Sequence, residues 1–304
     1  MGNTDSPHWH VLGAGSIGCL WTSKLLQSGF ACTVLLRPEK LDALGSFSHD
    51  LILTENGNTT THTVSLEAAG TSGQIDNLIV TTKAFNALKA VRSVAGQLSP
   101  SATIVLLQNG MGSQQAIAET FPEHSVYAGS TTDGAWLEDF LKIQRAGSGK
   151  TWLGSISTEP SSSISMLAGL QDMDIELTTD IQSKLLAKLA INSAINGLAA
   201  LQNCRNGDLL LSDNFRTVTQ LCKETEEILL ASGFRDNTNL LDVVKQVLIS
   251  TGDNICSTLQ DVRHQRPTEL AWINGYLLGL AETLNIEAPG HHRLMNDLAR
   301  QGIQ

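Results

Sequence analysis

The 304-residue chain lacks several features that mark other classes of protein. Basic residues are the minority, since 20 Lys and Arg stand against 30 Asp and Glu for a net charge of −10. Such an acidic chain is a poor candidate for a general nucleic-acid binder, because nothing offsets its repulsion from phosphates. No apolar run approaches the ~20 residues of a membrane helix, and the N-terminal residues lack the basic and apolar start of a secretory signal. We therefore expect a cytoplasmic protein that binds neither nucleic acid nor membrane.

Patterns for disulfides and metal ions are also missing. The five cysteines are odd in number, widely spaced and without a CxxC pair, which favours reduced thiols over a disulfide framework or a zinc site. The eight histidines show no spacing typical of metal ligands. The adjacent His291 and His292 are interpreted as surface residues. We expect no metal.

What the chain does have is enough apolar sequence for a sizeable core, with 41% hydrophobic and 16% charged residues. Its length favours two domains. In the first part, strands predicted at 10–12, 32–36, 77–82 and 103–107 alternate with helical patterns at 15–28 and 85–96. This alternation predicts βαβ units and a parallel sheet. Further short strands, expected to be antiparallel or mixed, are predicted near 124–130, 134–138, 142–146 and 150–153, and the Ser-rich 159–165 is predicted to be a loop.

From about residue 180 the strand patterns stop and helical patterns take over. Helices are predicted at about 180–199, 213–232, 238–250, 267–285 and 291–301. The sequence thus predicts an α/β protein in which a Rossmann-type parallel-sheet domain, residues 1–178, is followed by an all-helical C-terminal domain, residues 179–304.

A glycine-rich string joins the first predicted strand to the first helix. It reads Gly13-Ala14-Gly15-Ser16-Ile17-Gly18, a GxGxxG pattern in the context that gives it meaning. The first glycine allows a tight turn, the second a close approach of backbone to a pyrophosphate, and the third close packing of helix on strand. The helix N-terminus offers free N–H groups to the phosphates. The alternative is a turn that needs glycines for its shape alone.

Basic and amide side chains follow the next strands. Arg37 stands where NAD-binding proteins carry an acidic residue, and it could pair with a 2′-phosphate through two hydrogen bonds. We therefore favour NADP over NAD, although Arg37 could also be a solvent-facing loop residue. Lys83 and Asn109 follow two further strands, where ligands of such sheets bind. Their alternatives are a solvated lysine and a turn asparagine.

Two stretches of the helical half carry polar residues in a pattern. Lys184, Lys188, Asn192 and Asn196 recur every four residues on an otherwise apolar helix, so they share one stripe. Spacing alone leaves open whether that stripe faces solvent or lines a polar site.

The second stretch runs from Asn254 to Glu269. Asn254 and Ser257 suit local turn chemistry. Pro267 suits the first turn of the helix that follows, and Glu269 would lie near the positive end of that helix.

Seven motifs in this chain resemble those of the ketopantoate reductase (2-dehydropantoate 2-reductase) family. In family order and covering most of the chain, they are GAGSIG, Arg37, TTKAFN around Lys83, LQNGMG around Asn109, KLAINSAING from Lys188, NCRNGDLL around Asn206, and NICSTLQDVRHQRPTE ending at Glu269. The resemblance implies a Rossmann domain joined to a helical domain. It also implies NADPH-dependent reduction of 2-dehydropantoate to pantoate, on the route to pantothenate and coenzyme A.

The resemblance also implies roles for individual residues. Lys188 would be the general acid that protonates the carbonyl oxygen, and Glu269 would bind the substrate, chiefly at its hydroxyl end. Lys83 would lie near the nicotinamide ribose. Polar groups of substrate or cofactor would be held by Asn109, Asn192, Asn196, Asn254 and Ser257, with Asn206 a further substrate-site residue and Glu269 also close to the cofactor.

Two departures from the family pattern keep other functions open. Gly197 stands where some members have proline, and Ala271-Trp272 replaces an Asp-Tyr pair. The alternatives are a related NADP-dependent reductase of another 2-oxo acid and a catalytically silent NADP-binding sensor. Either a monomer or a homodimer is expected.

Overall fold

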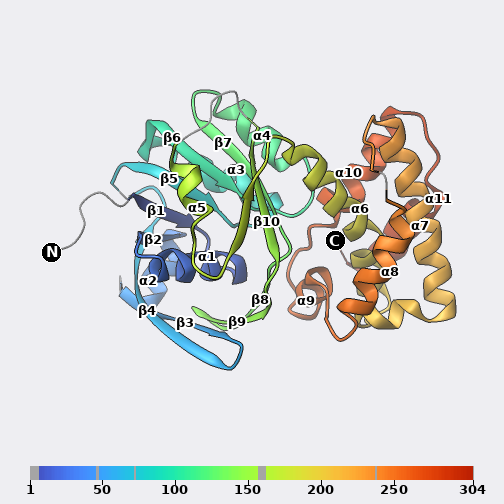
Figure 1. The fold of residues 1–304 in the computed structure, drawn as a ribbon, viewed down its shortest axis with the longest axis horizontal. Coiled ribbons are helices and arrows are strands. Elements are labelled where there is room, and N and C mark those ends of the chain that lie inside the picture. Colours follow the sequence, from blue (N-terminus) through green and yellow to red (C-terminus); the bar gives the residue numbers. More distant parts are fainter. Residues whose placement is uncertain (1–6, 46–47, 72, 157–161, 237, 304) are drawn as a thin grey trace. The chain divides into compact units, whose positions relative to one another are not determined.

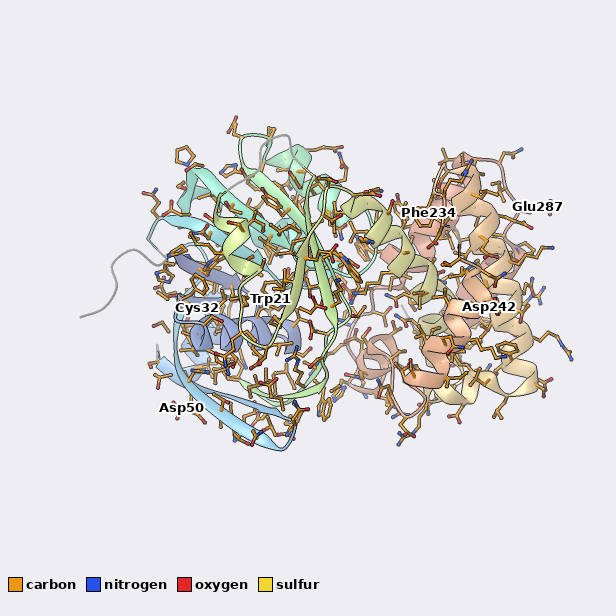
Figure 2. The ribbon with its side chains drawn as sticks, in the orientation of Figure 1. Trp21, Cys32, Asp50, Phe234, Asp242 and Glu287 are labelled. Carbon is orange, nitrogen blue, oxygen red and sulfur yellow. The ribbon has the colours of Figure 1, made fainter. Side chains whose placement is uncertain are left out.

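A computed structural model describes residues 7–45, 48–71, 73–156, 162–236 and 238–303 of the chain. The chain divides into two compact units. We call the first, Met1–Gln108 with Ser113–Ile181, the sheet unit, and the second, Asn109–Gly112 with Gln182–Gln304, the helical unit. Figure 1 shows the ribbon of each, and Figure 2 shows side chains filling the interior of both.

The sheet unit contains one mixed sheet of eleven strands in the order β11-β10-β7-β6-β5-β1-β2-β4-β3-β9-β8. Its centre is parallel, since β1 pairs in parallel with β2 and β5, and β6 with β5 and β7. The predicted Rossmann-type parallel sheet is therefore confirmed. The strands are β1 (His8–Leu12), β2 (Ala31–Leu36), β3 (Ser48–Glu55), β4 (Asn58–Ala68), β5 (Ile75–Val80), β6 (Leu98–Leu106), β7 (Ser125–Thr131), β8 (Gly134–Asp139), β9 (Lys142–Gly147), β10 (Lys150–Ser155) and β11 (Asp174–Leu177).

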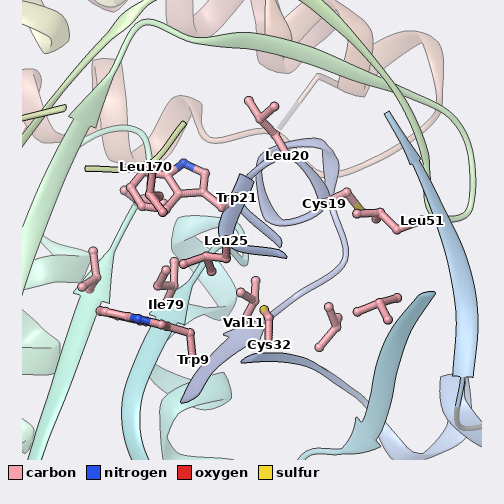
Figure 3. Packing of buried hydrophobic residues seen from close by; sticks show 14 of the residues in the cluster. Trp9, Val11, Cys19, Leu20, Trp21, Leu25, Cys32, Leu51, Ile79 and Leu170 are labelled. Atoms are coloured by element: carbon pink, nitrogen blue, oxygen red, sulfur yellow. The ribbon is translucent and has the colours of Figure 1, made fainter. Parts of the chain in front are cut away.

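Side chains alternate between the two faces of these strands and build a core on each face. On one face Trp9 and Val11 pack with Trp21 and Leu25 of the first helix, as Figure 3 shows. On the other face Leu12 and its neighbours pack with residues of α3 and α4. The helices of this unit are α1 (Ser16–Gln27), α2 (Pro38–Leu44), α3 (Ala84–Ser93), α4 (Ser113–Thr120) and α5 (Ser162–Leu167), with a 3-10 turn η1 (Ala95–Gln97).

The largest feature not predicted from the sequence is the antiparallel hairpin of β3 and β4. Its turn contains Asn56 and Gly57, both at positive φ (49° and 77°), which is the residue pair that tight hairpin turns favour. That dipeptide was a usable signal. The predicted loop at 159–165 lies partly outside the described residues, and its described end opens α5 instead.

Strands β7 and β8 run antiparallel to β9 and β10 and form a two-stranded ribbon that bends in the middle. The two halves of this ribbon therefore join the sheet at opposite ends. β7 pairs with β6 and β10, whereas β9 pairs with β3 and β8. The expected antiparallel or mixed pairing of this segment is confirmed. At the bend the Arg145 guanidinium donates to Asp133 at 2.6 Å and to Glu55 of β3 at 3.0 Å, and the buried Lys24 ammonium of α1 pairs with the same Glu55.

The helical unit consists of α6 (Ile181–Leu201), η2 (Asn206–Leu210), α7 (Ser212–Ala231), α8 (Leu240–Ser250), α9 (Ser257–Arg263), α10 (Leu270–Thr283) and α11 (Pro289–Arg300). The predicted helical C-terminal region is thus confirmed. Two details differ. Pro267 precedes α10 instead of opening it, because that helix starts at Leu270 with Glu269 as its N-cap. His291 is fully buried, so its interpretation as a surface residue was wrong.

Candidate functional site

The glycine string forms a tight turn between β1 and α1 in the sheet unit. Gly13 has φ of +113°, and its N–H donates to the carbonyl of Leu35. A Cβ on Gly18 would lie 2.1 Å from the Gly13 carbonyl oxygen, so only glycine lets helix and strand pack this closely. A Cβ on Gly15 would meet nothing within 4 Å.

The first turn of α1 fits an anionic group. Gly15 caps the helix without a side-chain hydrogen bond, and no acidic residue lies in the first turn. Ala14, Gly15, Ser16 and Ile17 are all only part-buried. Exposed N–H groups at the positive end of a helix are the elements that bind a nucleotide phosphate.

Arg37 and Lys83 both lie where a strand passes into a helix. Arg37 follows β2 directly, caps α2 and is exposed. Lys83 caps α3 after β5 and is part-buried. Both therefore lie past the carboxyl ends of parallel strands, the edge at which such sheets bind ligands.

Asn109 lies on a four-residue loop that belongs to the helical unit. The loop is held on α10 by the Met111 N–H, which donates to the Trp272 carbonyl at 2.9 Å. Gly110 adopts φ of +78°, and a Cβ there would lie 2.3 Å from that same carbonyl oxygen. The loop can reach α10 this closely only with glycine at position 110.

Three of the predicted site residues form a hydrogen-bonded chain within the helical unit. The Lys188 ammonium on α6 donates to Asn109 Oδ1 at 2.8 Å, and Asn109 Nδ2 donates to Glu269 Oε2 at 3.1 Å. Glu269 is only 4% exposed, whereas Lys188 and Asn109 are part-buried. The amide of Asn109 thus connects the cation to the carboxylate, with its oxygen toward Lys188 and its nitrogen toward Glu269.

Burial lowers the pKa of Lys188 to about 8, and the Glu269 carboxylate partly opposes this by favouring the charged amine. An amine with a pKa near the working pH can both stabilise developing negative charge and give up a proton. Within the described part of the helical unit, the Lys188 ammonium donates to Asn109 alone. Because an ammonium has three N–H donors, Lys188 has the capacity to donate to an oxygen of a ligand as well.

The remaining polar residues of α6 continue from Lys188 along the same stripe. Asn192 is part-buried and Asn196 buried, each one helical turn further on. The Asn196 carbonyl accepts a hydrogen bond from the Cys256 thiol, next to the exposed Ser257 at the start of α9. Ser257 thus lies at the Asn196 end of the stripe.

Asn206 and Asn254 form a separate pair. The Asn206 N–H donates to the Asn254 carbonyl at 3.0 Å, and the Asn206 side chain donates to Thr251. These two hydrogen bonds involve none of the side chains of the Lys188–Asn109–Glu269 chain.

Reasoning from sequence missed the buried residues behind α6, namely Asn274 and His291. Neither follows a motif or a spacing rule, so no sequence signal marked them. Among the described residues no group of three or more His, Cys, Asp or Glu side chains could hold a metal ion. No helix in the described ranges is long and apolar enough to cross a membrane.

By its fold the chain falls in the class of proteins that join a Rossmann-type sheet unit to a helical unit. The model of "Ketopantoate reductase PanE/ApbA" matches residues 9–158, and the model of its C-terminal domain matches residues 180–301. The 2-dehydropantoate 2-reductase of Yersinia pestis is 32% identical over 96% of this chain and 94% of its own. The chain therefore belongs to the ketopantoate reductase family.

Solved structures share the whole fold at lower identity. D-mandelate dehydrogenase, solved with NADH and anilino(oxo)acetate, aligns with a TM-score of 0.86 and 20% identity over 97% of this chain and 98% of its own. The dimeric ketopantoate reductase of Staphylococcus aureus aligns with a TM-score of 0.82 and 17% identity over 97% and 98% of the two chains. At these identities the similarity shows the fold alone.

Proposed function

We propose that this protein reduces 2-dehydropantoate to pantoate with NADPH, as a cytoplasmic enzyme on the route to pantothenate and coenzyme A. Family membership supports the reaction class. The observation that carries the proposal is the Lys188–Asn109–Glu269 chain, which holds an amine of lowered pKa beside a buried carboxylate. Residues 1–178 would bind the cofactor and residues 179–304 the substrate.

Lys188 is the proton donor in this proposal. When a hydride reaches C2 of the oxo acid, negative charge develops on the former carbonyl oxygen. The Lys188 ammonium stabilises that charge and transfers a proton to the oxygen, leaving a neutral amine that regains a proton from water. Asn109 Oδ1 accepts from the ammonium and so orients it toward its target.

Glu269 and the asparagines position the substrate. The Glu269 carboxylate accepts a hydrogen bond from the substrate hydroxyl, while Asn192, Asn196, Asn206, Asn254 and Ser257 offer amide and hydroxyl groups to its other polar atoms. Because Glu269 already accepts from Asn109, the same amide orients the acid and the carboxylate that binds substrate.

NADP(H), when bound, supplies the hydride. The turn from Gly13 to Gly18 and the first turn of α1 fit its pyrophosphate, because residues 13–17 are only part-buried and a Cβ on Gly15 would meet nothing within 4 Å. Lys83, Asn109 and Glu269 would lie toward the nicotinamide end. Arg37 would pair with the 2′-phosphate, which NAD lacks.

The proposal is tested by the rate of NADPH oxidation on addition of 2-dehydropantoate, with NADH run in parallel. We expect NADPH to give the higher kcat/KM, and Arg37→Ala to reduce that preference without changing kcat at saturating cofactor. Lys40→Ala, in the same first turn of α2, is the control for a general loss of positive charge. An unchanged cofactor preference in Arg37→Ala would contradict the role of Arg37.

A second candidate is the reduction of another 2-oxo acid. Two positions that depart from the family pattern lie close to other helical-unit residues: Gly197, where a Cβ would lie 3.1 Å from the Leu294 side chain, and Trp272, whose backbone carbonyl accepts from the loop of Asn109. A panel of 2-oxo acids separates the candidates, since the true substrate gives the highest kcat/KM. Cofactor binding without turnover on any of them would instead indicate the silent sensor.

A further inference from the structure

Behind the reactive face of α6, four side chains from four helices form a buried polar network. They are Ser193 of α6, Thr225 of α7, Asn274 of α10 and His291 of α11, and each is fully buried. We call them the Ser193 network. None of the four belongs to the proposed catalytic or substrate-binding set.

The acceptors in this network fix the direction of its hydrogen bonds. Asn274 Nδ2 lies 2.8 Å from the Ser193 carbonyl, which can only accept, and 3.3 Å from His291 Nδ1. His291 Nε2 lies 3.2 Å from the Leu221 carbonyl, also an acceptor, and 2.9 Å from the Thr225 hydroxyl. The proton of His291 is therefore on Nε2, and Nδ1 accepts from Asn274.

The same acceptors allow only one orientation of the Asn274 amide. If its nitrogen and oxygen exchanged places, the oxygen would face the Ser193 carbonyl and repel it. His291 Nδ1 keeps the nitrogen on that side by accepting its second N–H. The Ser193 hydroxyl, which donates to the Ala190 carbonyl, lies 3.2 Å from the Thr225 hydroxyl and anchors α6 a second time.

The Ser193 network joins α6, which carries Lys188, to α10, which begins after Glu269. The two joined residues lie equally far along the chain from Lys188 and from Glu269. Ser193 lies five residues after Lys188 on α6, and Asn274 lies five residues after Glu269 at the start of α10. Five residues are about 7.5 Å of helix. A bond between Ser193 and Asn274 therefore fixes how far α6 has advanced along α10, and with it the gap that Asn109 bridges between Lys188 and Glu269.

The bond is not needed to satisfy α6 itself. The Ser193 carbonyl lies inside a helix that continues to Leu201, so it already has a helical partner. Among the described residues Asn274 Oδ1 has no hydrogen-bond partner, although it is buried. A buried amide oxygen without a hydrogen bond costs free energy of folding. Such a cost is expected where the amide serves to hold another group in position.

We propose that Asn274, oriented by His291, is a positioning residue that sets the register of α6 on α10 and so aligns Lys188 with Asn109 and Glu269. This inference rests on the proposed function of Lys188 as proton donor. Asn274 touches neither substrate nor cofactor in this proposal. It acts through the backbone of Ser193.

The test is a double-mutant cycle between Asn274→Leu and Lys188→Ala. Leucine is close to asparagine in size and cannot donate to Ser193. We expect Asn274→Leu alone to lower kcat by ~10- to ~100-fold, the range for a reactive group displaced by about 1 Å. In the Lys188→Ala background the same substitution should change kcat by less than about twofold, because the group it positions is gone.

Leu277→Ala is the matched control. Leu277 is fully buried on α10, one turn after Asn274, and its truncation destabilises the same helix without removing a hydrogen-bonding group of the Ser193 network. We expect Leu277→Ala to lower Tm yet leave kcat within about twofold. An Asn274→Leu effect that is equally large with and without Lys188 would overturn the positioning role.

A second measurement does not depend on turnover. The titration of Lys188, followed by NMR of labelled lysine in the folded protein, has an expected midpoint at about 8. Asn274→Leu should move that midpoint and Leu277→Ala should not. An unmoved midpoint in Asn274→Leu overturns the inference, whereas a protein that reduces no oxo acid but shows the shift overturns the proposed function alone.

Discussion

The proposed chemistry depends on Lys188, and sequence spacing alone did not establish the environment of this residue. The four-residue repeat of Lys184, Lys188, Asn192 and Asn196 predicted one polar stripe but left its environment open. The structure distinguishes Lys188 from a solvated lysine by its bond to Asn109 and by its burial. No spacing rule could reveal that partner, which lies 79 residues earlier in the chain.

Lys188 should also set the pH dependence of the reaction. Its pKa is lowered to about 8, so the amine is protonated below that pH and increasingly neutral above it. We expect kcat for reduction to fall as pH rises through about 8. Lys188→Ala should lower kcat by at least ~100-fold and abolish this alkaline decline, measured by NADPH oxidation between pH 6 and 10. Persistence of the same decline in Lys188→Ala would assign it to another group.

The interpretation of His291 as a surface residue was wrong. Two adjacent histidines are usually exposed, but the α11 N-terminus turns His291 inward, where Glu224 accepts from the N–H groups of Gly290 and His291. Burial lowers the pKa of His291, and His292 adds to this, while Glu224 and the bond to the Leu221 carbonyl oppose it.

Acid should therefore destabilise the helical unit through His291. A lowered pKa means that the unfolded chain binds the proton more readily, so the stabilisation is full above pH 6.5 and is lost as the pH falls below it. We expect the free energy of unfolding to drop from pH 7 to pH 5 less steeply in His291→Gln than in the wild type, as measured by urea titration. Equal slopes would show that other groups cause the acid sensitivity.

At the scale of elements, the parallel strands and long helices and the short strands β7 to β10 were predicted well, whereas the β3–β4 hairpin and the short α9 were not. The strands and helices around the glycine turn followed from apolar runs and breakers. The β3–β4 hairpin was missed because β4 is rich in threonine and polar residues, and because one of its edges pairs with β2, a strand distant in sequence. The short α9 was read as turn chemistry, since seven residues give too little periodicity.

The loop from Asn109 to Gly112 is the element whose shape matters most to the site. Alanine at position 110 would be strained at φ of +78° and would collide with the Trp272 carbonyl. We expect Gly110→Ala to displace Asn109 and lower kcat by ~10-fold or more, measured by NADPH oxidation at saturating substrate and cofactor. Gly279→Ala, where a Cβ meets nothing, is the control. Wild-type kcat in Gly110→Ala would contradict the importance of this loop.

At the scale of the whole molecule, each of the two units is stabilised internally by a different kind of interaction. The sheet unit relies partly on the Arg145 ion pairs at the bend of the β7–β10 ribbon, where Asp133 is fully buried as a side chain. The helical unit relies on apolar helix packing around the Ser193 network. Proteins of two such units often unfold in more than one step, so each step reports on its own unit.

Arg145→Met should destabilise the sheet unit selectively. It leaves the Asp133 carboxylate buried without its cation, a loss of about 3–5 kcal/mol for a broken buried pair. The control is Lys150→Met, which removes an exposed pair with Glu176 and should leave the free energy of unfolding nearly unchanged. Denaturant unfolding followed by circular dichroism, with the His291→Gln transition marking the helical unit, measures both. Equal losses in the two variants would contradict the importance of the bend.

The four residues from Asn109 to Gly112 make the two units inseparable by any single cut of the chain. Cleavage near residue 181 would leave the bridging asparagine on one piece and both of its charged partners on the other. A gene fusion that exchanged the C-terminal half would likewise transfer Lys188 and Glu269 without Asn109, unless the recipient already carried the same four-residue loop. Halves of two proteins can therefore be exchanged only where both proteins have this loop.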